Sequence, residues 1–347
     1  MDNTNPEPLT VPTKSHKAEK NPFFRCVSAV TFTLTFLLVI TLFFCYLLRP
    51  DFCAAITFFP AWFWLVPGGL LMLLGRKVNR WVRSIGILAW LTFVGLFVQE
   101  ASSLLRSCVF PAKSYETAKD GDSLRIISLN CGGGSLDAAR EVMQYQPDIV
   151  LLQEAPAKQQ VETLAQQLFG DKGMVVQTAD MAILSRGYVE EVNLPPTSRT
   201  FMAAAQVQLP SGLEMWLISV HLLPPATGMN LFSRSCWKEH REDRQLRRQQ
   251  VVRIAEQIKS VSGIFPIILG GDFNVSAADG ALRPLRSWLR DSFDEAGIGW
   301  GNTAPSHLPL WRIDQIWVSS HFRSNAVFSR KTERSDHWMV VCDITQR

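Results

Sequence analysis

Two long uncharged stretches near the N-terminus constrain the fold of this chain more than any other feature. Residues 26–48 and 52–74 contain no charged side chain, and each reaches the roughly 20 residues that a helix needs to cross a bilayer core. A third stretch, 84–105, is weaker because Glu100 interrupts it. We therefore predict a membrane anchor over residues 23–108 with about three transmembrane helices. A cleaved signal peptide is a poorer interpretation, since the first run is too long and no small-residue cleavage site follows it.

Basic residues in the short loops predict the orientation of this anchor, because Lys and Arg favour the cytoplasmic side. The loop 49–51 carries one Arg, whereas more basic residues precede the first span and separate the second from the third: Lys14, Lys17, Lys20, Arg25, Arg76, Lys77, Arg80 and Arg83. Three spans place the tail 1–22 in the cytoplasm and the C-terminal region on the extracytoplasmic side of the cell (inner) membrane. If the third stretch only lies on the membrane surface, the C-terminal region is cytoplasmic instead.

Charge divides along the same boundary. Residues 1–120 hold 12 Lys and Arg against 7 Asp and Glu, while residues 121–347 hold 23 against 24. The basic balance of the chain therefore belongs to the anchor and does not indicate nucleic-acid binding. Residues 234–253 are an exception, with seven Lys and Arg against three acids; they predict either a phosphate-binding face or a solvated helix surface with internal ion pairs. The seven cysteines show no CxxC spacing, so we expect no essential disulfide and no zinc site.

The remainder of the chain alternates short apolar runs with helical periodicity. After a polar linker at 109–120, apolar runs of strand length occur at 123–130, 148–154, 181–186, 214–222, 265–274, 313–319 and 337–344. Apolar residues at helical spacing lie over 161–168 and under the basic segment at 238–259. This alternation predicts a layered α/β domain over residues 121–347.

Polar side chains end or begin strand after strand in this domain. They are Asn130, Glu154, His221, Asp272, Asn274, Asp314, Asp336 and His337. A single Asp at the end of a strand is more often a turn former, but carboxylates are seldom buried unless they are paired or bind metal. Because the ends of neighbouring strands meet at one rim of a sheet, we expect these side chains to converge on one site. The remaining four histidines match no motif and are expected at the surface.

Six short motifs around these residues stand in the order typical of a known family. They are SLN (128–130), PDIVLLQE (147–154), SVHL (219–222), GGDFN (270–274), RIDQI (312–316) and SDH (335–337). Through them the chain resembles the endonuclease/exonuclease/phosphatase family of metal-dependent phosphoesterases. The resemblance implies a four-layer sandwich of two β-sheets flanked by helices, with the active site at one end of the sandwich.

The resemblance also implies a Mg²⁺ or Mn²⁺ cofactor, which prefers hard oxygen ligands. Glu154 would be its main ligand, with Asn130 and Asp336 nearby. Asp272 and Asn274 would position and polarise the attacking water.

Two histidines complete the implied machinery. His337, oriented by Asp314, would act as general base or as hydrogen-bond donor to a phosphate oxygen, and His221 would donate to the phosphate as negative charge develops. The chemistry needs such groups whatever the family, because attack on phosphorus builds charge on the phosphoryl oxygens and requires an acceptor for the proton of water. The glycines of GGGS (132–135) either form a turn into the next helix or let a phosphate approach the backbone.

A phosphoesterase domain behind a membrane anchor is similar in layout to teicoplanin-resistance membrane proteins of this family. That resemblance implies a lipid-linked, undecaprenyl-type pyrophosphate as substrate and the bilayer as partner. We expect Asn130, Arg312, Arg234 and Arg241 to contact the substrate. The alternatives are a membrane-tethered endonuclease or exonuclease that binds nucleic acid, and a catalytically silent scaffold. No obligate protein partner is indicated.

Overall fold

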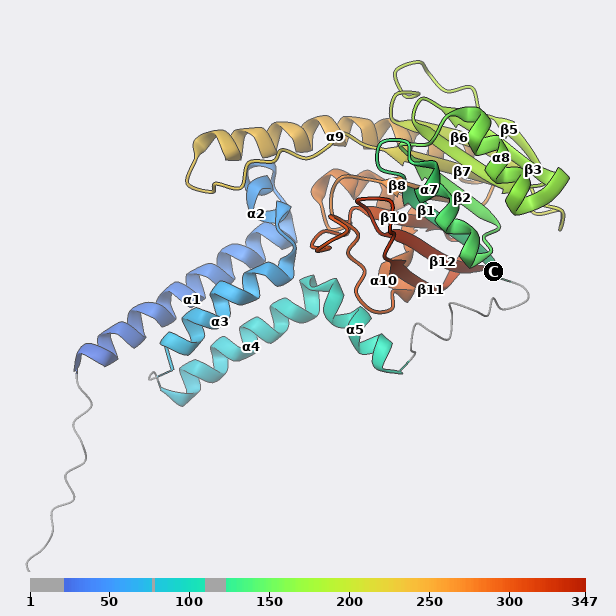
Figure 1. The fold of residues 1–347 in the computed structure, drawn as a ribbon. Coiled ribbons are helices and arrows are strands. Elements are labelled where there is room, and N and C mark those ends of the chain that lie inside the picture. Colours follow the sequence, from blue (N-terminus) through green and yellow to red (C-terminus); the bar gives the residue numbers. More distant parts are fainter. Residues whose placement is uncertain (1–21, 77–78, 110–122) are drawn as a thin grey trace, which may run out of the picture.

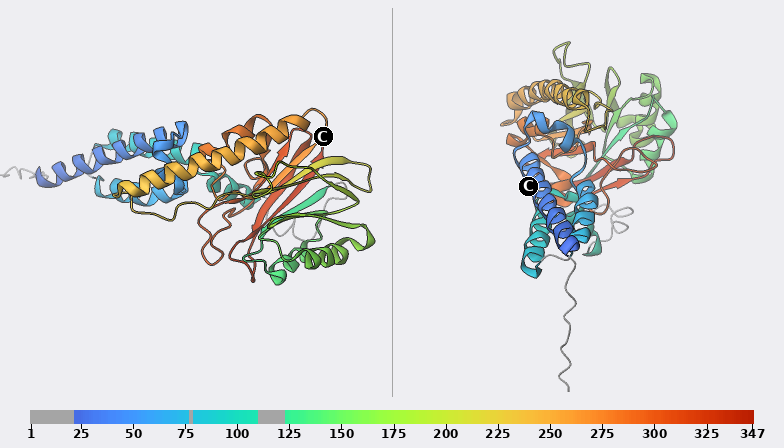
Figure 2. Two further views of the ribbon diagram at one scale, coloured as in Figure 1. Left: turned by 90° about the horizontal axis from the view of Figure 1, so that it is seen from above. Right: turned by 90° about the vertical axis from the view of Figure 1, so that its left-hand side faces the viewer.

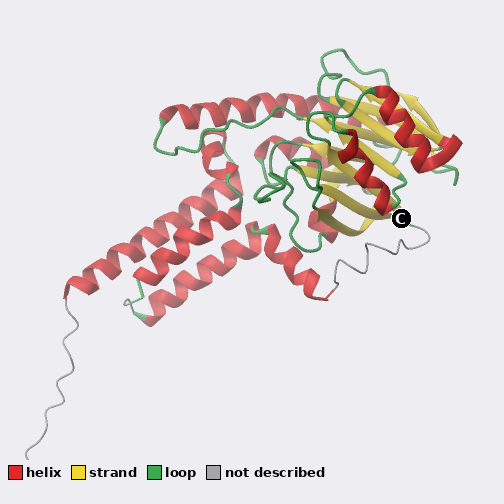
Figure 3. Cartoon of the chain, viewed as in Figure 1, coloured by secondary structure: helices red, strands yellow, loops and turns green. Residues whose placement is uncertain are grey.

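The computed structural model describes residues 22–76, 79–109 and 123–347 (Figure 1). Most of the predicted N-terminal tail and of the linker 109–120 lies outside these residues. A group of N-terminal helices stands beside a domain that contains all the strands (Figure 3). The two parts are in direct contact through side-chain hydrogen bonds such as that from Arg283 Nη2 to the carbonyl of Leu48, 3.1 Å.

Three N-terminal helices lie side by side: α1 (Pro22–Leu48), α3 (Leu65–Leu74) and α4 (Arg80–Phe97). They pack closely because small residues face large ones; a Cβ on Gly68 would lie 2.1 Å from the ring of Trp90. Large apolar side chains such as Leu37 and Leu88 are nevertheless exposed on the outside of the group. Cys26–Leu48 and Arg80–Phe97 are long and apolar enough to cross a membrane, and a bent pair of helices would make a third span.

The bent pair occupies the second predicted span, 52–74. Its first half contains η1 (Asp51–Cys53) and α2 (Ala54–Phe58), its second half contains η2 (Ala61–Trp64) and α3, and the two halves meet at 76°. Pro60 explains the break: Phe59, which precedes it, is extended, with φ −67° and ψ 141°.

The third predicted span, 84–105, also differs from the structure. Helix α4 ends at Phe97, and a separate helix α5 (Gln99–Val109) follows, so Glu100 belongs to α5. Helix α5 is fixed to the strand-rich domain, since Arg106 donates to the carbonyls of Phe293, Asp294 and Glu295. These polar contacts explain why the chain turns away from the direction of α4.

The strands form two six-stranded mixed sheets. The first has the order β11-β12-β1-β2-β4-β3, with β1 Leu124–Asn130, β2 Ile149–Gln153, β3 Gly173–Thr178, β4 Met181–Arg186, β11 Phe322–Arg330 and β12 Met339–Gln346. The second has the order β5-β6-β7-β8-β10-β9, with β5 Tyr188–Glu191, β6 Met202–Gln208, β7 Glu214–His221, β8 Ile267–Asp272, β9 Leu289–Asp291 and β10 Asp314–Ser319. Inward-facing residues of both sheets, such as Leu151 and Ile316, share one buried core.

Helices cover the outer faces of both sheets, which confirms the expected sandwich. Helices α7 (Leu136–Arg140) and α8 (Lys158–Phe169) pack on the first sheet, and α9 (Arg234–Val261) packs on the second. The short elements η3 (Glu141–Tyr145), η4 (Gly170–Lys172), η5 (Gly280–Ser287) and α10 (Ser292–Ala296) complete the domain. Helix α9 is 28 residues long, and its N-terminal half extends beyond the sheets to contact η1 and α2 (Figure 2).

Candidate active site

Three neighbouring strands of the second sheet place His221, Asp272 and Asp314 in one row. β7 and β8 are parallel with His221 opposite Asp272, and β10 runs antiparallel to β8 with Asp314 opposite Asp272. The row lies at the end of β8, where its apolar segment stops. Asp272 and Asp314 are each 1% exposed, so two carboxylates lie side by side in a nearly dry environment. The acid at the end of the IILGGD strand therefore belongs to a site and is not a solvated turn.

The first sheet contributes Asn130 at the end of β1 and Glu154 directly after β2. Nδ2 of Asn130 donates to Oε1 of Glu154 at 3.2 Å and to Oδ2 of Asp272 at 3.1 Å. Glu154 has a φ of +45°, a backbone conformation that is uncommon for a residue other than glycine. The amide of Gly133 donates to its Oε2 at 2.5 Å. The two sheets thus meet at their rims through side chains that the motifs had singled out.

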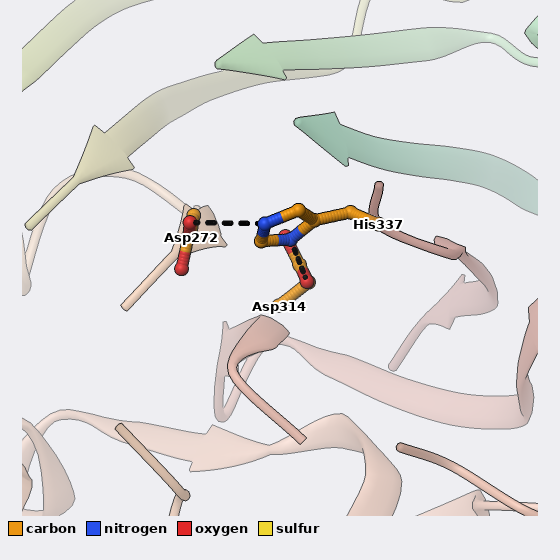
Figure 4. Close-up of side chains that lie close together, drawn as sticks. All are labelled: Asp272, Asp314 and His337. Carbon is orange, nitrogen blue, oxygen red and sulfur yellow. Dashed lines mark hydrogen bonds and ion pairs between the residues drawn. The ribbon is translucent and has the colours of Figure 1, made fainter. Parts of the chain in front are cut away.

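His337 connects the two buried carboxylates, as Figure 4 shows. Its Nδ1 lies 2.8 Å from Oδ2 of Asp314, and its Nε2 lies 4.0 Å from Oδ2 of Asp272. The contact with Asp314 orients the ring and leaves Nε2 directed at Asp272. The predicted pairing of His337 with Asp314 is therefore present in the folded chain.

His221 has a matching arrangement on the other side of Asp272. Its Nε2 lies 3.9 Å from the same Oδ2, and its Nδ1 lies 2.7 Å from Oδ2 of Asp180. Sequence reasoning missed Asp180, which lies in the short turn between β3 and β4. A single Asp in a turn does not stand out in a sequence. The only available signal was that a functional histidine usually has a carboxylate at its second ring nitrogen, which could have prompted a search for a partner of His221.

The charges in this cluster shift one another's pKa values. Burial and the neighbouring Asp314 raise the pKa of Asp272 to about 6, although both histidines oppose the shift. Burial lowers the pKa of His337, but the carboxylates of Asp314 and Asp272 outweigh it and raise the pKa to about 10. Burial likewise lowers the pKa of His221, and Asp180 with Asp272 raises it above its ordinary value. The cluster stabilises charged imidazoles beside a carboxyl group that resists ionisation.

Asn274, Asp336 and the glycine turn border this cluster. The backbone amide of Asn274 donates to Oδ1 of Asp272 at 2.8 Å, and its side-chain amide donates to the carbonyl of Leu222. Asp336 is exposed, and a Cβ on Gly132 would lie 2.9 Å from its Oδ1. Gly132 has φ +57°, so the turn brings its backbone close to two acidic side chains.

The donor atoms of the cluster suit a hard divalent cation. Asp272, Asp314 and His337 offer ligand atoms that all lie within 4.8 Å of one another. Among the described residues, Oδ1 of Asp314 is buried and has no hydrogen-bond partner. The carboxylate of Glu154 adds further oxygens next to this group, because Nδ2 of Asn130 donates to both Glu154 and Asp272 and holds the two side chains together. Carboxylate and amide oxygens are the ligands that Mg²⁺ and Mn²⁺ prefer, so these residues fit such an ion.

The three arginines that we expected to bind substrate differ in their solvent exposure. Arg234 and Arg241 are exposed on α9. Arg312 is buried, where it forms an ion pair with Asp291 at 2.5 Å and donates to Oε1 of Gln99 at 2.9 Å.

The basic segment of α9 is only partly a solvated surface. Arg244 and Arg247 are buried, and so is His240, which we had expected at the surface. Arg244 and His240 are buried because η1 and α2 cover this part of α9, whereas Arg247 is buried against the carbonyl of Leu223. The sequence of α9 alone does not reveal these contacts.

The comparisons with known proteins concern the strand-rich domain. The model of the endonuclease/exonuclease/phosphatase family matches residues 127–337. No curated protein matches the chain.

Solved structures with a similar fold include the mannosyl-6-phosphatase Bt3783 of Bacteroides thetaiotaomicron VPI-5482, with 16% identity and a TM-score of 0.50 over 64% of this chain and 99% of that one. An endonuclease/exonuclease/phosphatase from Bacteroides vulgatus has 16% identity and a TM-score of 0.50 over 65% and 99%. A conserved protein of unknown function from Enterococcus faecalis V583 has 14% identity and a TM-score of 0.50 over 65% and 100%. At these identities the likeness concerns the fold.

Proposed function

The chain belongs to the endonuclease/exonuclease/phosphatase family, and on that premise we propose that it is a membrane-anchored, divalent-metal-dependent phosphoesterase. Its substrate is a phosphate ester or pyrophosphate on a lipid, of the undecaprenyl type, which it hydrolyses by attack of water. The observation that carries this proposal is the convergence of two oriented histidines on Asp272. Their Nε2 atoms lie 3.9 and 4.0 Å from the same carboxylate oxygen.

This arrangement assigns a task to each group. Asp180 and Asp314 hold the Nδ1 atoms of the two histidines, so each ring presents Nε2 to the space around Asp272. Nε2 protons can donate to phosphoryl oxygens as their negative charge increases, and Oδ2 of Asp272 can accept the proton of the attacking water. Asn274 and Asn130 keep the carboxylate of Asp272 in place through hydrogen bonds. In this proposal His337 donates a hydrogen bond from Nε2 to a phosphoryl oxygen. The sequence had left open whether it is this donor or the general base.

Two neighbouring sets of residues, with no member in common, are available to the metal. As the family resemblance implies, Glu154 would be the main ligand of Mg²⁺ or Mn²⁺, with Asn130 and Asp336 nearby. The buried group of Asp272, Asp314 and His337 is the other set, although Nδ1 of His337 is already engaged by Asp314. A bound ion would supply charge neutralisation at the phosphoryl oxygens.

The arrangement of the helices favours an extracytoplasmic active site. The beginning of α1, the end of α3 and the beginning of α4 lie at the end of the helix group farthest from the strand-rich domain (Figure 1). Arg76 comes shortly after α3, and Arg80 and Arg83 belong to the start of α4. If the helix group spans the bilayer, this basic end favours the cytoplasm and the active site faces the other side.

A membrane-tethered nuclease is the competing function, and one experiment separates the two. Purified full-length protein in detergent with Mg²⁺ is given a polyprenyl pyrophosphate or DNA, and phosphate release and strand cleavage are measured. We expect phosphate release from the lipid that is lost in Glu154→Ala. DNA cleavage without phosphate release would instead establish the nuclease. Unchanged phosphate release in Asp272→Ala would contradict the assigned mechanism, and no turnover of either substrate would favour a silent scaffold.

A further inference from the structure

A cavity of about 480 Å³ lies between α2 of the N-terminal helices and the strand-rich domain, and it borders the candidate active site at Asn274 and Asp336. Asn274 and Asp336 line it at the catalytic end, and Thr57 and Phe58 of α2 line it at the anchor end. Its volume falls in the range of about 300–1,000 Å³ that is typical of small-molecule sites. One cavity therefore borders both the reaction centre and a helix that precedes the catalytic domain by more than 60 residues of chain.

Specific contacts fix α2 as a wall of this cavity. Arg244 of α9 donates to the hydroxyl of Thr57 and to the carbonyl of Pro50, the latter at 3.2 Å, and it forms an ion pair with Asp279 at 2.8 Å. Nε1 of Trp311 donates to the carbonyl of Phe58 at 3.1 Å. These bonds join the anchor to the catalytic domain directly beside the cavity. The N-terminal helices thus do more than tether the domain.

The anchor end of the cavity is largely apolar. The ring of Phe58 lies 4.7 Å from that of His240 and 5.5 Å from that of Trp311, centroid to centroid. Met229 lines the same cavity and is 54% exposed, so it lies toward the solvent-accessible part of the lining. Aromatic and thioether side chains of this kind bind flexible aliphatic chains by apolar contact.

Arg247 is a buried cation in the lining. It is 3% exposed, and its Nε and Nη2 both donate to the carbonyl of Leu223, at 3.1 and 2.9 Å. No carboxylate among the described residues lies within ion-pair distance of it, whereas the buried arginines Arg244 and Arg312 each have one. The carboxylates of Asp279, Asp243 and Asp272 act on Arg247 only at longer range. Burial of a charge that has no direct ion pair is costly. Leu223 is two residues after His221, so the carbonyl that binds this cation lies close in the chain to the reaction centre.

We propose that this cavity binds the part of the substrate beyond the reacting phosphate. The second phosphate group of an amphiphilic pyrophosphate pairs with Arg247, and the first segment of its apolar chain lies against Phe58 and Trp311. The inference rests on the proposed function and deepens it, because it makes α2 part of the substrate site. Water adds to the terminal phosphorus and the bond to the bridging oxygen breaks. Inorganic phosphate leaves, and the lipid monophosphate remains at Arg247 until it dissociates.

The test compares two pyrophosphates with the same head group, farnesyl pyrophosphate and the short isopentenyl pyrophosphate, on the full-length protein in detergent with Mg²⁺. Phe58→Ala is expected to reduce kcat/KM for the farnesyl compound about tenfold and to leave that for the isopentenyl compound nearly unchanged. The quantity compared between variants is the ratio of kcat/KM for the farnesyl compound to kcat/KM for the isopentenyl compound. Met229→Trp, at an exposed position that does not support the fold, should lower this ratio because the larger side chain narrows the cavity. Phe52→Ala is the matched control, since Phe52 is exposed on the anchor outside this cavity and should leave the ratio unchanged.

A binding measurement separates failure of this inference from failure of the proposed function. Farnesyl monophosphate is titrated into Glu154→Ala protein, in which turnover is not required. Arg247→Gln in that background should raise the Kd about tenfold or more, whereas Lys259→Gln, an exposed cation on the same helix, should not change it. Chain-dependent binding without any hydrolysis by the parent protein would keep the cavity and overturn the phosphoesterase. Hydrolysis by the parent protein, together with the same Kd for farnesyl monophosphate when Phe58→Ala or Met229→Trp is added to the Glu154→Ala background, would overturn the proposal that the cavity binds the substrate.

Discussion

The side chain of Asn130 joins the two sheets by donating from Nδ2 to Oδ2 of Asp272 at 3.1 Å. Asn130 ends β1 of the first sheet and Asp272 ends β8 of the second. The same amide group donates to Glu154 at 3.2 Å, while Oδ1 accepts the backbone amide of Gly132 at 3.0 Å. Only a side chain that is both donor and acceptor can make all these contacts, which excludes a carboxylate at this position.

Asn130→Asp is therefore expected to abolish the proposed phosphoesterase activity, although the shape of the side chain changes little. The substitution removes both donations and adds a third acid beside Asp272 and Glu154. We expect kcat/KM to fall by about 10²-fold or more, because the groups around the reacting phosphate lose their alignment. Steady-state kinetics in saturating Mg²⁺ would measure the change. Activity within a few-fold of the parent would show that the bond between the sheets is unimportant for catalysis.

Asp180 is expected to act through His221. In Asp180→Asn the imidazole keeps a hydrogen-bond partner but loses the carboxylate that raises its pKa. We expect kcat to fall by about 10- to 100-fold and the alkaline limb of the pH–rate profile to move to lower pH. Asp180→Asn added to His221→Ala should cost little more than His221→Ala alone. Additive losses in the double variant would contradict a shared role.

The pair of His337 and Asp314 predicts how stability depends on pH in the presence of a chelator. The folded-state pKa of His337 is raised to about 10, against an ordinary value of about 6.5, so the folded state binds this proton more tightly than the unfolded state. The stabilisation is complete below about pH 6.5 and is lost as the pH rises toward 10. Thermal unfolding between these limits should show a falling Tm in the parent protein and a flatter curve in Asp314→Asn. Parallel curves would exclude the pair as the source.

Metal binding should be visible as stabilisation. A ligand at 100 times its Kd raises the free energy of unfolding by about 2.7 kcal/mol when it binds only the folded state. We expect Mg²⁺ or Mn²⁺ to raise the Tm of the parent, and Glu154→Gln to remove most of that rise if Glu154 is the main ligand. If Asp314→Asn removes it while Glu154→Gln does not, the ion is held by the group of Asp272, Asp314 and His337.

Gly271 is expected to be required for folding of the second sheet. A Cβ at this position would lie 2.0 Å from the carbonyl oxygen of Val220 on β7, and the φ of +147° is unfavourable for other residues. Gly271→Ala should lower the free energy of unfolding by at least about 2 kcal/mol, because β7 and β8 must separate or bend. Denaturant unfolding would measure it against Gly263→Ala, where no atom lies within 4 Å of the new Cβ.

Local patterns were sufficient for much of the fold. The seven apolar runs with polar ends correspond to strands, and the periodicity at 238–259 lies within α9. They were not sufficient for β6, which reads MAAAQVQ, because its alanines favour a strand only once they are buried between two other strands. The break in the second apolar stretch was also missed. A proline such as Pro60 can stand in a continuous transmembrane helix or end one, and only the packing of the neighbouring segments decides between these two outcomes.

The sequence by itself determined which polar residues stand at the ends of the central strands: Asn130, Glu154, His221, Asp272, Asp314 and His337. Strand ends within one sheet meet because backbone hydrogen bonds align them, whereas the rims of the two sheets meet only through tertiary packing, as between Asn130 and Asp272. Only the tertiary structure decided that Asp180 would orient His221 and that Arg247 would be buried against the carbonyl of Leu223. Both depend on contacts between segments far apart in the chain, where a lone Asp or Arg looks the same whether it is solvated or enclosed.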